Sequence, residues 1–485
     1  MSRYHSVRLD HELCMGCTNC IKKCPTEAIR VRDGKAQIAD NRCIDCGECL
    51  KACPHHAKSA SMDSLDNISN YDYTIALAAP SLYAQFGPPA SRFMVLSALQ
   101  NLGFDDVYEV AIGADIVTEN TIRLLRQTGK KVPRPLISSA CPVVVRLIQM
   151  RFPGLIDNLV PFDSPMEVTA ELARADAILK TGLKSERIGV FFISPCPAKR
   201  TATYFPIGRN RSQVDEVLSF ADVYPLILTK LDKLSPAMVE ETRKRELAKA
   251  DGIRWAYTGG ESMSLNLDKY LAVDGIHNVI SILEEIENER LRDIDFIEPN
   301  SCIGGCIGGP LTVSNRFSAK SRQRVYVREA NELAFEEPGS FHNLNKLQLE
   351  EWDIPLEPNK ALNLAENISD ALVKYDQMEQ VAKRLPGLDC GACGAPTCAS
   401  LAEDIVRGLA TETDCIFKLK DRIRAVAAEM IELENEMSRH APLPGDNGSE
   451  SVVKLAYQEK DNVELPSANN EATGQADTGK AEDVL

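Results

Sequence analysis

The feature that most constrains this chain is a cysteine pattern that occurs twice within its first 54 residues. Each copy reads C-x2-C-x2-C-x3-C-P. Spacings this short let one loop wrap a single metal group, with backbone amides pointing at the sulfurs. Two complete copies in tandem favour two 4Fe–4S clusters over zinc sites or free buried thiols. The eight cysteines are Cys14, Cys17, Cys20, Cys24, Cys43, Cys46, Cys49 and Cys53.

This double run resembles that of the bacterial two-cluster ferredoxins, and it implies a small α+β domain over residues 1–62. Asp33 and Gly34 lie between the runs and form a hairpin turn signal. In such ferredoxins the fourth cysteine of each run ligates the other cluster. One cluster is therefore expected on Cys14, Cys17, Cys20 and Cys53, and the second on Cys43, Cys46, Cys49 and Cys24.

Four more cysteines stand near the other end of the chain with the spacing C-x2-C-x4-C-x16-C. Neighbouring glycines allow close backbone approach, and a helix fits between the third and fourth cysteines. The pattern resembles the small helical 4Fe–4S domain of electron-transfer and corrinoid proteins, here over residues 360–418. A zinc site is the alternative. The expected ligands are Cys390, Cys393, Cys398 and Cys415.

Length and composition limit the remaining possibilities. A chain of 485 residues is long enough for two to four domains. Its formal net charge of -15 argues against nonspecific binding to nucleic acid or anionic membranes. The start lacks the features of a signal peptide, and no apolar run reaches the roughly 18 residues of a spanning helix. Sixteen cysteines without a secretory signal indicate metal ligation rather than a disulfide scaffold, so we expect a cytoplasmic protein.

Between residues 70 and 345 strand-like and helix-like segments alternate. Alternation of this kind predicts an α/β domain with mostly parallel sheets in two lobes, and continuously apolar strands fit sheets covered on both faces. Helices are expected over 91–103 and 165–182. Strands are expected over 73–82, 135–141, 187–194, 252–259 and 293–299.

The four cysteines not yet assigned follow three of these strands. Open α/β sheets bind ligands beyond the carboxyl ends of their strands, so the four could meet there. Cys302 and Cys306 are spaced i, i+4, and one helical turn could present both thiolates. The glycines around them leave room for a bulky cofactor. The alternative is a set of unrelated buried thiols, but the neighbouring iron–sulfur runs favour a further cluster on Cys141, Cys196, Cys302 and Cys306.

These segments resemble the three signatures of the diiron (FeFe) hydrogenases, TSCCPxW, MPCxxKxxE and ExMxCxxGCxxGG. The chain has SSACPVV at 138–144, SPCPAKRTA at 194–202 and EPNSCIGGCIGG at 298–309. The order of the segments, the preceding ferredoxin-like run and the neighbouring GAD (113–115) and TGG (258–260) also fit the family.

The resemblance implies a cofactor and roles for individual residues. The four cysteines would hold the 4Fe–4S part of an H-cluster, and Cys306 would also bridge to a diiron unit that bears CO, cyanide and an amine-containing dithiolate. Lys199 occupies the position of a lysine that hydrogen-bonds a cyanide ligand, a charge-assisted contact. A solvated surface lysine is the alternative. Pro80, Ser81 and Pro195 stand in segments that line the cofactor.

Departures from the family pattern are equally informative. Ala140 stands where the family has the cysteine that relays protons to the diiron amine, and alanine has no ionisable group. Ser194 and Asn300 replace two methionines, Ala202 replaces a glutamate, and Met166 stands where glutamine is common. Such changes alter the polarity around a cofactor and tune its potential. They argue against fast turnover rather than against cofactor binding.

Alanine at this position, combined with extra C-terminal cluster ligands, resembles a hydrogen-sensing branch of the family. The expected function is therefore slow, reversible, heterolytic splitting of H2, with electrons relayed through 4Fe–4S clusters to a redox or signalling partner. Dedicated maturation proteins would supply the diiron unit. The alternatives are a metabolic hydrogenase linked to a ferredoxin or nicotinamide partner, and an iron–sulfur electron-transfer protein without the diiron unit.

The end of the chain carries two further expectations. Residues 419–440 form a helix with apolar positions three and four apart, which could form a homodimer, dock a partner or pack on its own domain. Residues 441–485 are rich in Pro, Gly, Ser, Asn and acidic residues, and we expect an acidic disordered tail.

Overall fold

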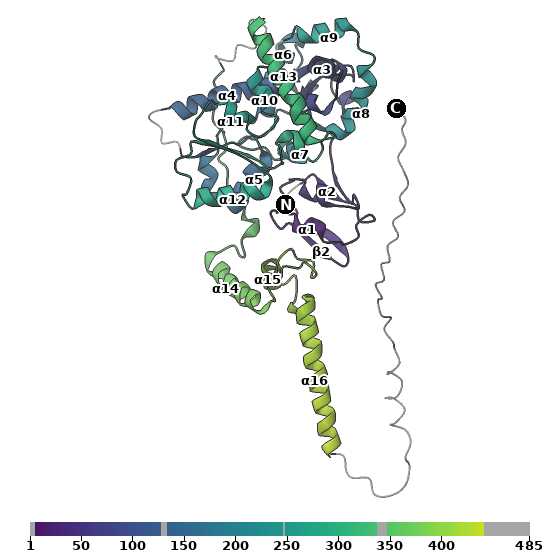
Figure 1. The fold of residues 1–485 in the computed structure, drawn as a ribbon, viewed down its shortest axis with the longest axis vertical. Helices are drawn as coiled ribbons and strands as arrows, with labels where there is room; N and C mark the ends of the chain where they lie inside the picture. The colour runs from purple at the N-terminus through teal and green to yellow at the C-terminus, as the bar shows by residue number, and fades with distance from the viewer. Residues whose placement is uncertain (1–4, 128–132, 246–247, 337–346, 441–485) are drawn as a thin grey trace, which may run out of the picture. The chain divides into compact units, whose positions relative to one another are not determined.

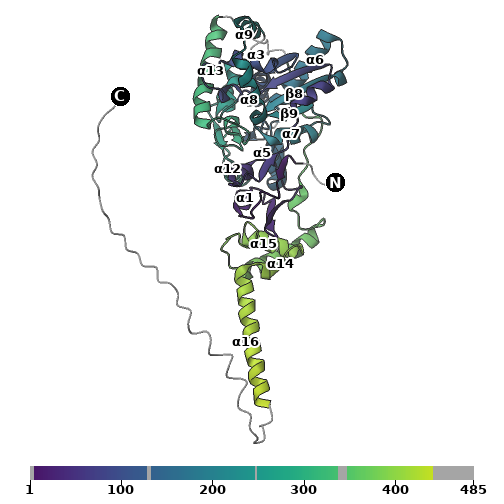
Figure 2. The same cartoon turned by 90° about the vertical axis from the view of Figure 1, so that its right-hand side faces the viewer.

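The computed structural model describes residues 5–127, 133–245, 248–336 and 347–440. The predicted acidic tail, 441–485, lies outside the described residues, as does the last part of the predicted central domain. The described residues up to Asp421 form one compact unit, and those from Arg422 to His440 belong to a second. Figures 1 and 2 show the chain in two views.

The ferredoxin-like segment folds as two small antiparallel ribbons around the cysteine loops. Asp33 and Gly34, with φ of 50° and 72°, make the predicted two-residue turn between two of the strands. Buried Val7, Ile21 and Ile29 pack beside the cysteines, so the apolar core is small. The elements are β1 (Val7–Leu9) paired with β4 (Lys58–Ala60), β2 (Ile29–Arg32) paired with β3 (Lys35–Ile38), and helices α1 (Asn19–Lys22) and α2 (Glu48–Ala52).

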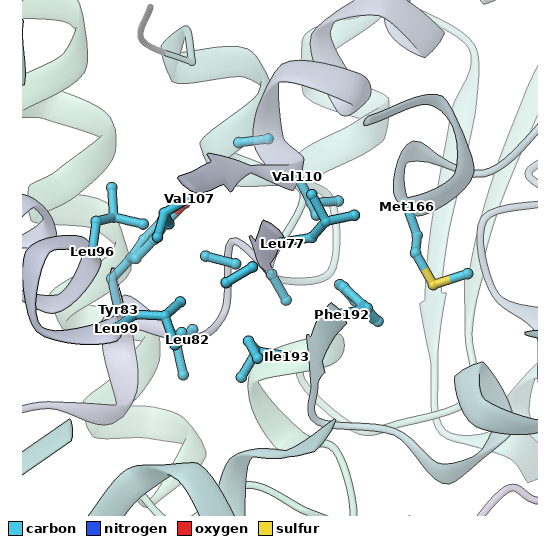
Figure 3. Close-up of a cluster of buried hydrophobic side chains, with 14 of the residues drawn as sticks. Leu77, Leu82, Tyr83, Leu96, Leu99, Val107, Val110, Met166, Phe192 and Ile193 are labelled. Carbon is cyan, nitrogen blue, oxygen red and sulfur yellow. The ribbon is translucent and has the colours of Figure 1, made fainter. Parts of the chain in front are cut away.

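The first lobe of the central domain is built on a fully parallel sheet of order β6-β5-β8-β9. The two middle strands are buried along most of their length because helices cover both faces, as continuous apolar runs predict. In Figure 3, Leu77 and Ile193 from neighbouring strands pack among buried side chains from the surrounding helices. The strands are β5 (Tyr73–Ala78), β6 (Asp106–Glu109), β8 (Ile188–Ser194) and β9 (Glu216–Ser219).

Helices of this lobe pack closely around the sheet. Gly113 of the GAD segment allows one such contact, because a Cβ there would lie 2.3 Å from the Pro165 carbonyl oxygen. The helices are α3 (Arg92–Gln100), α4 (Val110–Arg126), α6 (Pro165–Thr181), α8 (Phe220–Leu231), α9 (Pro236–Arg243), α10 (Ala250–Arg254) and α13 (Arg316–Glu336).

The second lobe contains a smaller parallel sheet of order β10-β11-β7. Its helices bury one apolar face against the strands, with Val144, Leu147 and Leu283 among the fully buried side chains. The elements are β7 (Leu136–Ile137), β10 (Tyr270–Asp274), β11 (Phe296–Asn300), α5 (Pro142–Arg151), α7 (Pro197–Tyr204), α11 (Gly260–Ser264) and α12 (Ile276–Glu287). The predicted fold class, with parallel sheets in two lobes, is confirmed.

The strand expected over 252–259 is wrong. This stretch is the end of α10 followed by turns. Buried Asp115 accepts hydrogen bonds from the backbone amides of Lys249 and Gly252 at 2.8 and 2.7 Å, which satisfies free donors at the start of this helix. A side chain distant in sequence therefore decided the local structure, and the apolar run packs as a helix.

The C-terminal cysteine segment is helical, with α14 (Ile368–Arg384) and α15 (Cys398–Val406) enclosing a small core of its own. The helix predicted over 419–440 is present as α16 (Ile416–His440). No helix in the described ranges is long and apolar enough to cross a membrane.

Candidate functional site

One buried cavity in the central domain brings together the four cysteines of the middle of the chain. They arrive from the ends of three strands in the two sheets: β7 precedes Cys141, β8 precedes Cys196, and β11 precedes Cys302. The carboxyl ends of parallel strands thus converge on one crevice, as the strand order predicts. The four side chains that line it are Cys141, Cys196, Cys302 and Cys306.

Two of these cysteines stand at helix starts. Cys141 is the N-cap of α5 and Cys196 is the N-cap of α7, and a proline follows each at the first helical position. Proline is favoured there because the first helical amide has no partner to lose. The partial positive charge of a helix N-terminus stabilises a thiolate beside it.

The other two cysteines stand on a glycine-rich loop rather than on one helical turn. Gly304 and Gly305 have φ of 88° and 85°, so the predicted i, i+4 helical presentation is wrong, and only a short 3-10 turn, Cys306–Gly308, follows. A Cβ on Gly305 would lie 2.7 Å from the Thr258 amide nitrogen. The left-handed backbone and this close approach both require glycine.

Three thiols of this cavity, those of Cys196, Cys302 and Cys306, have a raised pKa, which disfavours their thiolate forms. Burial raises the pKa of the Cys196 thiol to about 12 and that of Cys306 to about 11, and neighbouring cysteines raise both further. Lys199, which lines the cavity, opposes part of this shift. The donor set therefore suits a cationic metal group, which keeps coordinated thiols deprotonated.

The spacing of the cysteine quartets is too wide for a single zinc ion. Tetrahedral zinc with Zn–S bonds of about 2.3 Å holds its sulfurs roughly 3.8 Å apart. In the described ranges, one group has three ligand atoms that all lie within 4.8 Å of each other, and it consists of His5, Cys43 and Asp45. No three cysteines of a quartet lie that close together in these ranges. The cysteine quartets of the described residues therefore fit the zinc alternative poorly.

The other predicted site residues lie in or next to the same cavity. Pro80, Ser81, Pro195 and Asn300 line it, together with Met166. Ser194 is not among the lining residues; its Oγ accepts the Cys196 amide at 3.1 Å, so it shapes the loop that carries this cysteine.

Ala140 and Lys199 lie side by side in the cavity wall. The ammonium of Lys199 donates to the Ala140 carbonyl oxygen at 3.1 Å, which fixes it at the cavity rather than in solvent. The Ala140 side chain is a methyl group, so this residue itself supplies no ionisable group to the wall. Ala202 is buried and lines a small adjoining cavity with Ala140 and Lys199.

Two buried carboxylates were missed by the sequence reasoning. Glu261 and Glu298 line the cavity and are 5% and 3% exposed. Burial raises the pKa of both side chains, and the charge of Glu298 raises that of Glu261 further. Ser138 Oγ donates to Glu261 at 2.6 Å. Glu261 directly follows the TGG segment, and Glu298 is the first residue of the EPNSC segment. Their position beside these motifs was the signal that the sequence offered.

The N-terminal cysteines lie in two groups. Cys53 lines one small cavity with Cys14, Cys17 and Cys20. The Cys24 thiol lies close enough to affect the pKa of Cys43, Cys46 and Cys49. The second group lies next to the central cavity, because Cys46 belongs to the same buried cluster that Cys141 and Cys196 contact.

The C-terminal cysteines form a third group that rests on the ferredoxin-like segment. Cys393, Cys398 and Cys415 share one small core, and the charges of Cys390 and Cys415 act on Cys393. The Val31 amide donates to the Gly394 carbonyl oxygen at 2.8 Å, and Val31 also lines the cavity of the first N-terminal group.

Three ion pairs strengthen this contact. Asp404 receives hydrogen bonds from Arg30 and Arg32, and Arg42 pairs with Glu403. The C-terminal segment therefore contacts both the strand β2 and the loop that precedes Cys43.

Comparisons with known proteins agree with this arrangement. Residues 72–266 and 234–310 match the model of the iron only hydrogenase large subunit, C-terminal domain. Residues 6–54 match a 4Fe-4S dicluster domain, and residues 385–417 match an Fe-S cluster segment.

Several curated proteins are similar to this chain. Iron hydrogenase 1 of Clostridium pasteurianum is 25% identical over 371 residues, which are 63% of this chain and 65% of that protein. The periplasmic Fe hydrogenase large subunit of Nitratidesulfovibrio vulgaris is 27% identical over 391 residues, 68% of this chain and 93% of the relative. The NADP-reducing hydrogenase subunit HndD of Solidesulfovibrio fructosivorans is 23% identical, over 62% of this chain and 56% of its own length. The matches with the first and third of these proteins thus span less than two thirds of their lengths.

Among solved structures, the FeFe-hydrogenase HydA1 of Chlamydomonas reinhardtii is 16% identical with a TM-score of 0.43, over 59% of this chain and 94% of that one.

Proposed function

We propose that this chain, which belongs to the iron-only hydrogenase large-subunit family, reversibly splits H2 into two protons and two electrons, at a low rate that suits hydrogen sensing. The observation that carries the proposal is the convergence of four cysteines and Lys199 on one buried cavity. A cysteine quartet alone would suit a simple cluster, but the fixed ammonium beside it suits an anionic ligand as well.

The residues present fit an H-cluster. Cys141, Cys196 and Cys302 would each bind its cubane, and Cys306 would bind the cubane and the diiron unit. When bound, this cofactor supplies the metal centre at which H2 is cleaved heterolytically. Gly305 lets the Cys302–Cys306 loop pack directly against the backbone of Tyr257 and Thr258, where a Cβ would clash.

Lys199 serves as the positioning cation of the site. Its hydrogen bond to the Ala140 carbonyl leaves two of its three ammonium protons for an anionic ligand. A buried charge-assisted contact of this type is stronger than a neutral hydrogen bond.

Low turnover follows from the missing proton donor at Ala140. A proton must pass from the cavity to solvent through groups within hydrogen-bond reach or through bridging water. The acids that line the cavity are Glu261 and Glu298, and burial raises the pKa of both, which favours their protonated forms. Ser138 connects to Glu261 and could extend this path.

Electrons are proposed to travel through three further 4Fe–4S clusters. The contacts of the C-terminal segment with the ferredoxin-like segment, and of Cys46 with the buried cluster of the second lobe, support a relay that ends at the C-terminal group. A redox or signalling partner would exchange electrons there, and maturation proteins would install the diiron unit. Many metal-binding thiols require a reducing compartment, so we place the protein in the cytoplasm.

Infrared spectroscopy of the anaerobically matured full-length protein tests the proposal. We expect CO and cyanide bands under argon that shift when H2 is admitted. The Cys306→Ala variant should lack these bands and keep the signals of the N-terminal clusters. Absence of bands in the wild-type protein, with a known hydrogenase matured in parallel as the positive control, would show an electron-transfer protein without the diiron unit.

The rate of H2 oxidation separates sensing from metabolism. A sensor needs only enough turnover to change the redox state of its clusters, whereas a metabolic enzyme must carry flux. Turnover as fast as that of a metabolic hydrogenase assayed beside it would refute the sensing proposal and leave H2 chemistry in place.

A further inference from the structure

Seven of the exposed apolar side chains of α16 follow a heptad pattern. Counted along the helix, the steps between them are three, four, three, four, three and four residues. All seven are exposed to solvent, from 37% at Val426 to 74% at Met437. The seven residues are Ile416, Leu419, Ile423, Val426, Met430, Leu433 and Met437.

This period differs from that of a helix that packs on its own domain. A surface helix of a globular protein carries a broad apolar stripe with a period near 3.6 residues. A 3.5-residue period keeps a narrow seam facing one partner helix, and this is the pattern of a left-handed coiled coil. The seam runs for three heptads, and most other exposed positions of α16 are polar or charged.

The charges that flank the seam indicate which helix covers it. Lys420 and Arg422 flank its first half, and Glu434 and Glu436 flank its second half. A second copy running in the opposite direction would place each basic residue opposite an acidic one. A parallel copy would instead place Glu429 opposite Glu434, because flanking positions then pair five residues apart.

We propose that α16 associates with the same helix of a second copy of this chain as an antiparallel two-stranded coiled coil. Val426 of each copy packs against Met430 of the other, Ile423 against Leu433, and Leu419 against Met437. Lys420 pairs with Glu434 and Arg422 with Glu436, each twice by symmetry. Glu429 of one copy lies opposite Glu429 of the other copy near the midpoint of the coiled coil. This gives one unfavourable charge contact against four favourable contacts.

The antiparallel direction has a consequence for the clusters. The dimer axis passes near residue 428, so the two Ile416 ends are about 36 Å apart at 1.5 Å per residue. Ile416 directly follows the predicted cluster ligand Cys415. The two predicted C-terminal clusters of a dimer are therefore held apart, and the electron relay of one copy stays separate from that of the other.

Sedimentation velocity of the full-length protein under anaerobic conditions tests the association. Met430 and Ile431 are adjacent, apolar and 59% and 60% exposed, but only Met430 lies on the seam. We expect Met430→Asp to raise the dimer dissociation constant at least about tenfold, because it buries a charge in the seam. Ile431→Asp should change it less than about twofold, since that position stays in solvent in the dimer.

Equal effects of the two substitutions, or a wild-type protein that stays monomeric, would overturn the proposal. Circular dichroism and cluster absorbance of each variant show whether the chain remains folded. The Leu433→Asp variant provides a second seam position, should the first variant lose its helix.

Charge reversal determines the direction of the helices. In the antiparallel dimer Glu434→Lys places two lysines together and weakens association, and adding Lys420→Glu restores it. In a parallel dimer Glu434→Lys would instead create a pair with Glu429 and tighten association. Tightening by the single substitution would therefore refute the antiparallel arrangement.

Discussion

Two of the three ion pairs between the C-terminal cysteine segment and the ferredoxin-like segment share one buried carboxylate, Asp404. The Asp404 side chain is 6% exposed and accepts from Arg30 Nε at 2.7 Å and from an Arg32 guanidinium nitrogen at 2.7 Å. Asp404→Asn keeps the size of the side chain but removes its charge. Two guanidinium groups, 14% and 22% exposed, then lose their shared counter-ion.

Removing one partner of a buried ion pair costs about 3–5 kcal/mol. We take the lower limit, about 3 kcal/mol, because both arginines keep some solvent. At about 1.4 kcal/mol for each factor of ten, the equilibrium between docked and undocked segments shifts roughly a hundredfold toward the undocked state.

The Val31 amide reports this equilibrium directly. It points away from β3 and donates to Gly394 across the contact, so it loses its partner when the segments separate. Hydrogen-exchange mass spectrometry with peptide fragmentation should show Val31 exchanging roughly a hundredfold faster in Asp404→Asn. Amides between β2 and β3 should keep their protection, since that ribbon stays intact.

Glu412→Gln is the matched control. Glu412 pairs with Arg384 at 2.6 Å, but the two side chains are 31% and 50% exposed. Loss of such a pair costs at most about 1 kcal/mol, or less than about fivefold in exchange. If Asp404→Asn altered Val31 exchange by less than about threefold, Asp404 would not be the principal support of this contact.

Three further substitutions test the central cavity. Ala140→Cys places an ionisable group on the cavity wall and should raise H2 turnover at least several-fold. An unchanged rate in fully matured protein would show that proton transfer at this position does not limit turnover. Glu261→Gln keeps the contact with Ser138 but cannot exchange a proton, so H2 turnover should fall at least about a hundredfold while the infrared bands remain. Normal turnover in this variant would exclude Glu261 from the proton path. Gly309→Ala places a Cβ 2.6 Å from the Pro195 carbonyl oxygen, so it should abolish the CO and cyanide bands and leave the electron paramagnetic resonance signals of the N-terminal clusters unchanged. The control is Gly154→Ala, where nothing lies within 4 Å of the new Cβ, and this variant should keep both signals. Retained bands in Gly309→Ala would mean that the loops carrying Gly309 and Pro195 can move apart.

Features set by short-range spacing were predictable from the sequence. Cysteine runs, the Asp33-Gly34 turn and the apolar strands around Leu77 and Phe191 act over a few residues, and each is present as expected. The parallel arrangement of the sheets could also be predicted, because alternating strands and helices leave few ways to bury both faces of a sheet.

The failures came from contacts between distant residues. Asp115 holds the start of α10, and this contact converted an apolar run that reads as a strand into a helix. Left-handed glycines at 304 and 305 replaced the helical turn expected between Cys302 and Cys306, because the loop passes close to Tyr257 and Thr258.

The sequence by itself determined the number and grouping of the cysteines, since a ligand set depends on residue type and spacing. It also determined that position 140 carries no ionisable group, since alanine has none. Only the tertiary structure decided which acids share the cavity with Cys306 and which surface of the ferredoxin-like segment receives Gly394. Glu261 and Glu298 are far apart along the chain, and long-range packing brings both to the same cavity. Long-range packing likewise brings the Val31 amide within hydrogen-bond reach of the Gly394 carbonyl oxygen.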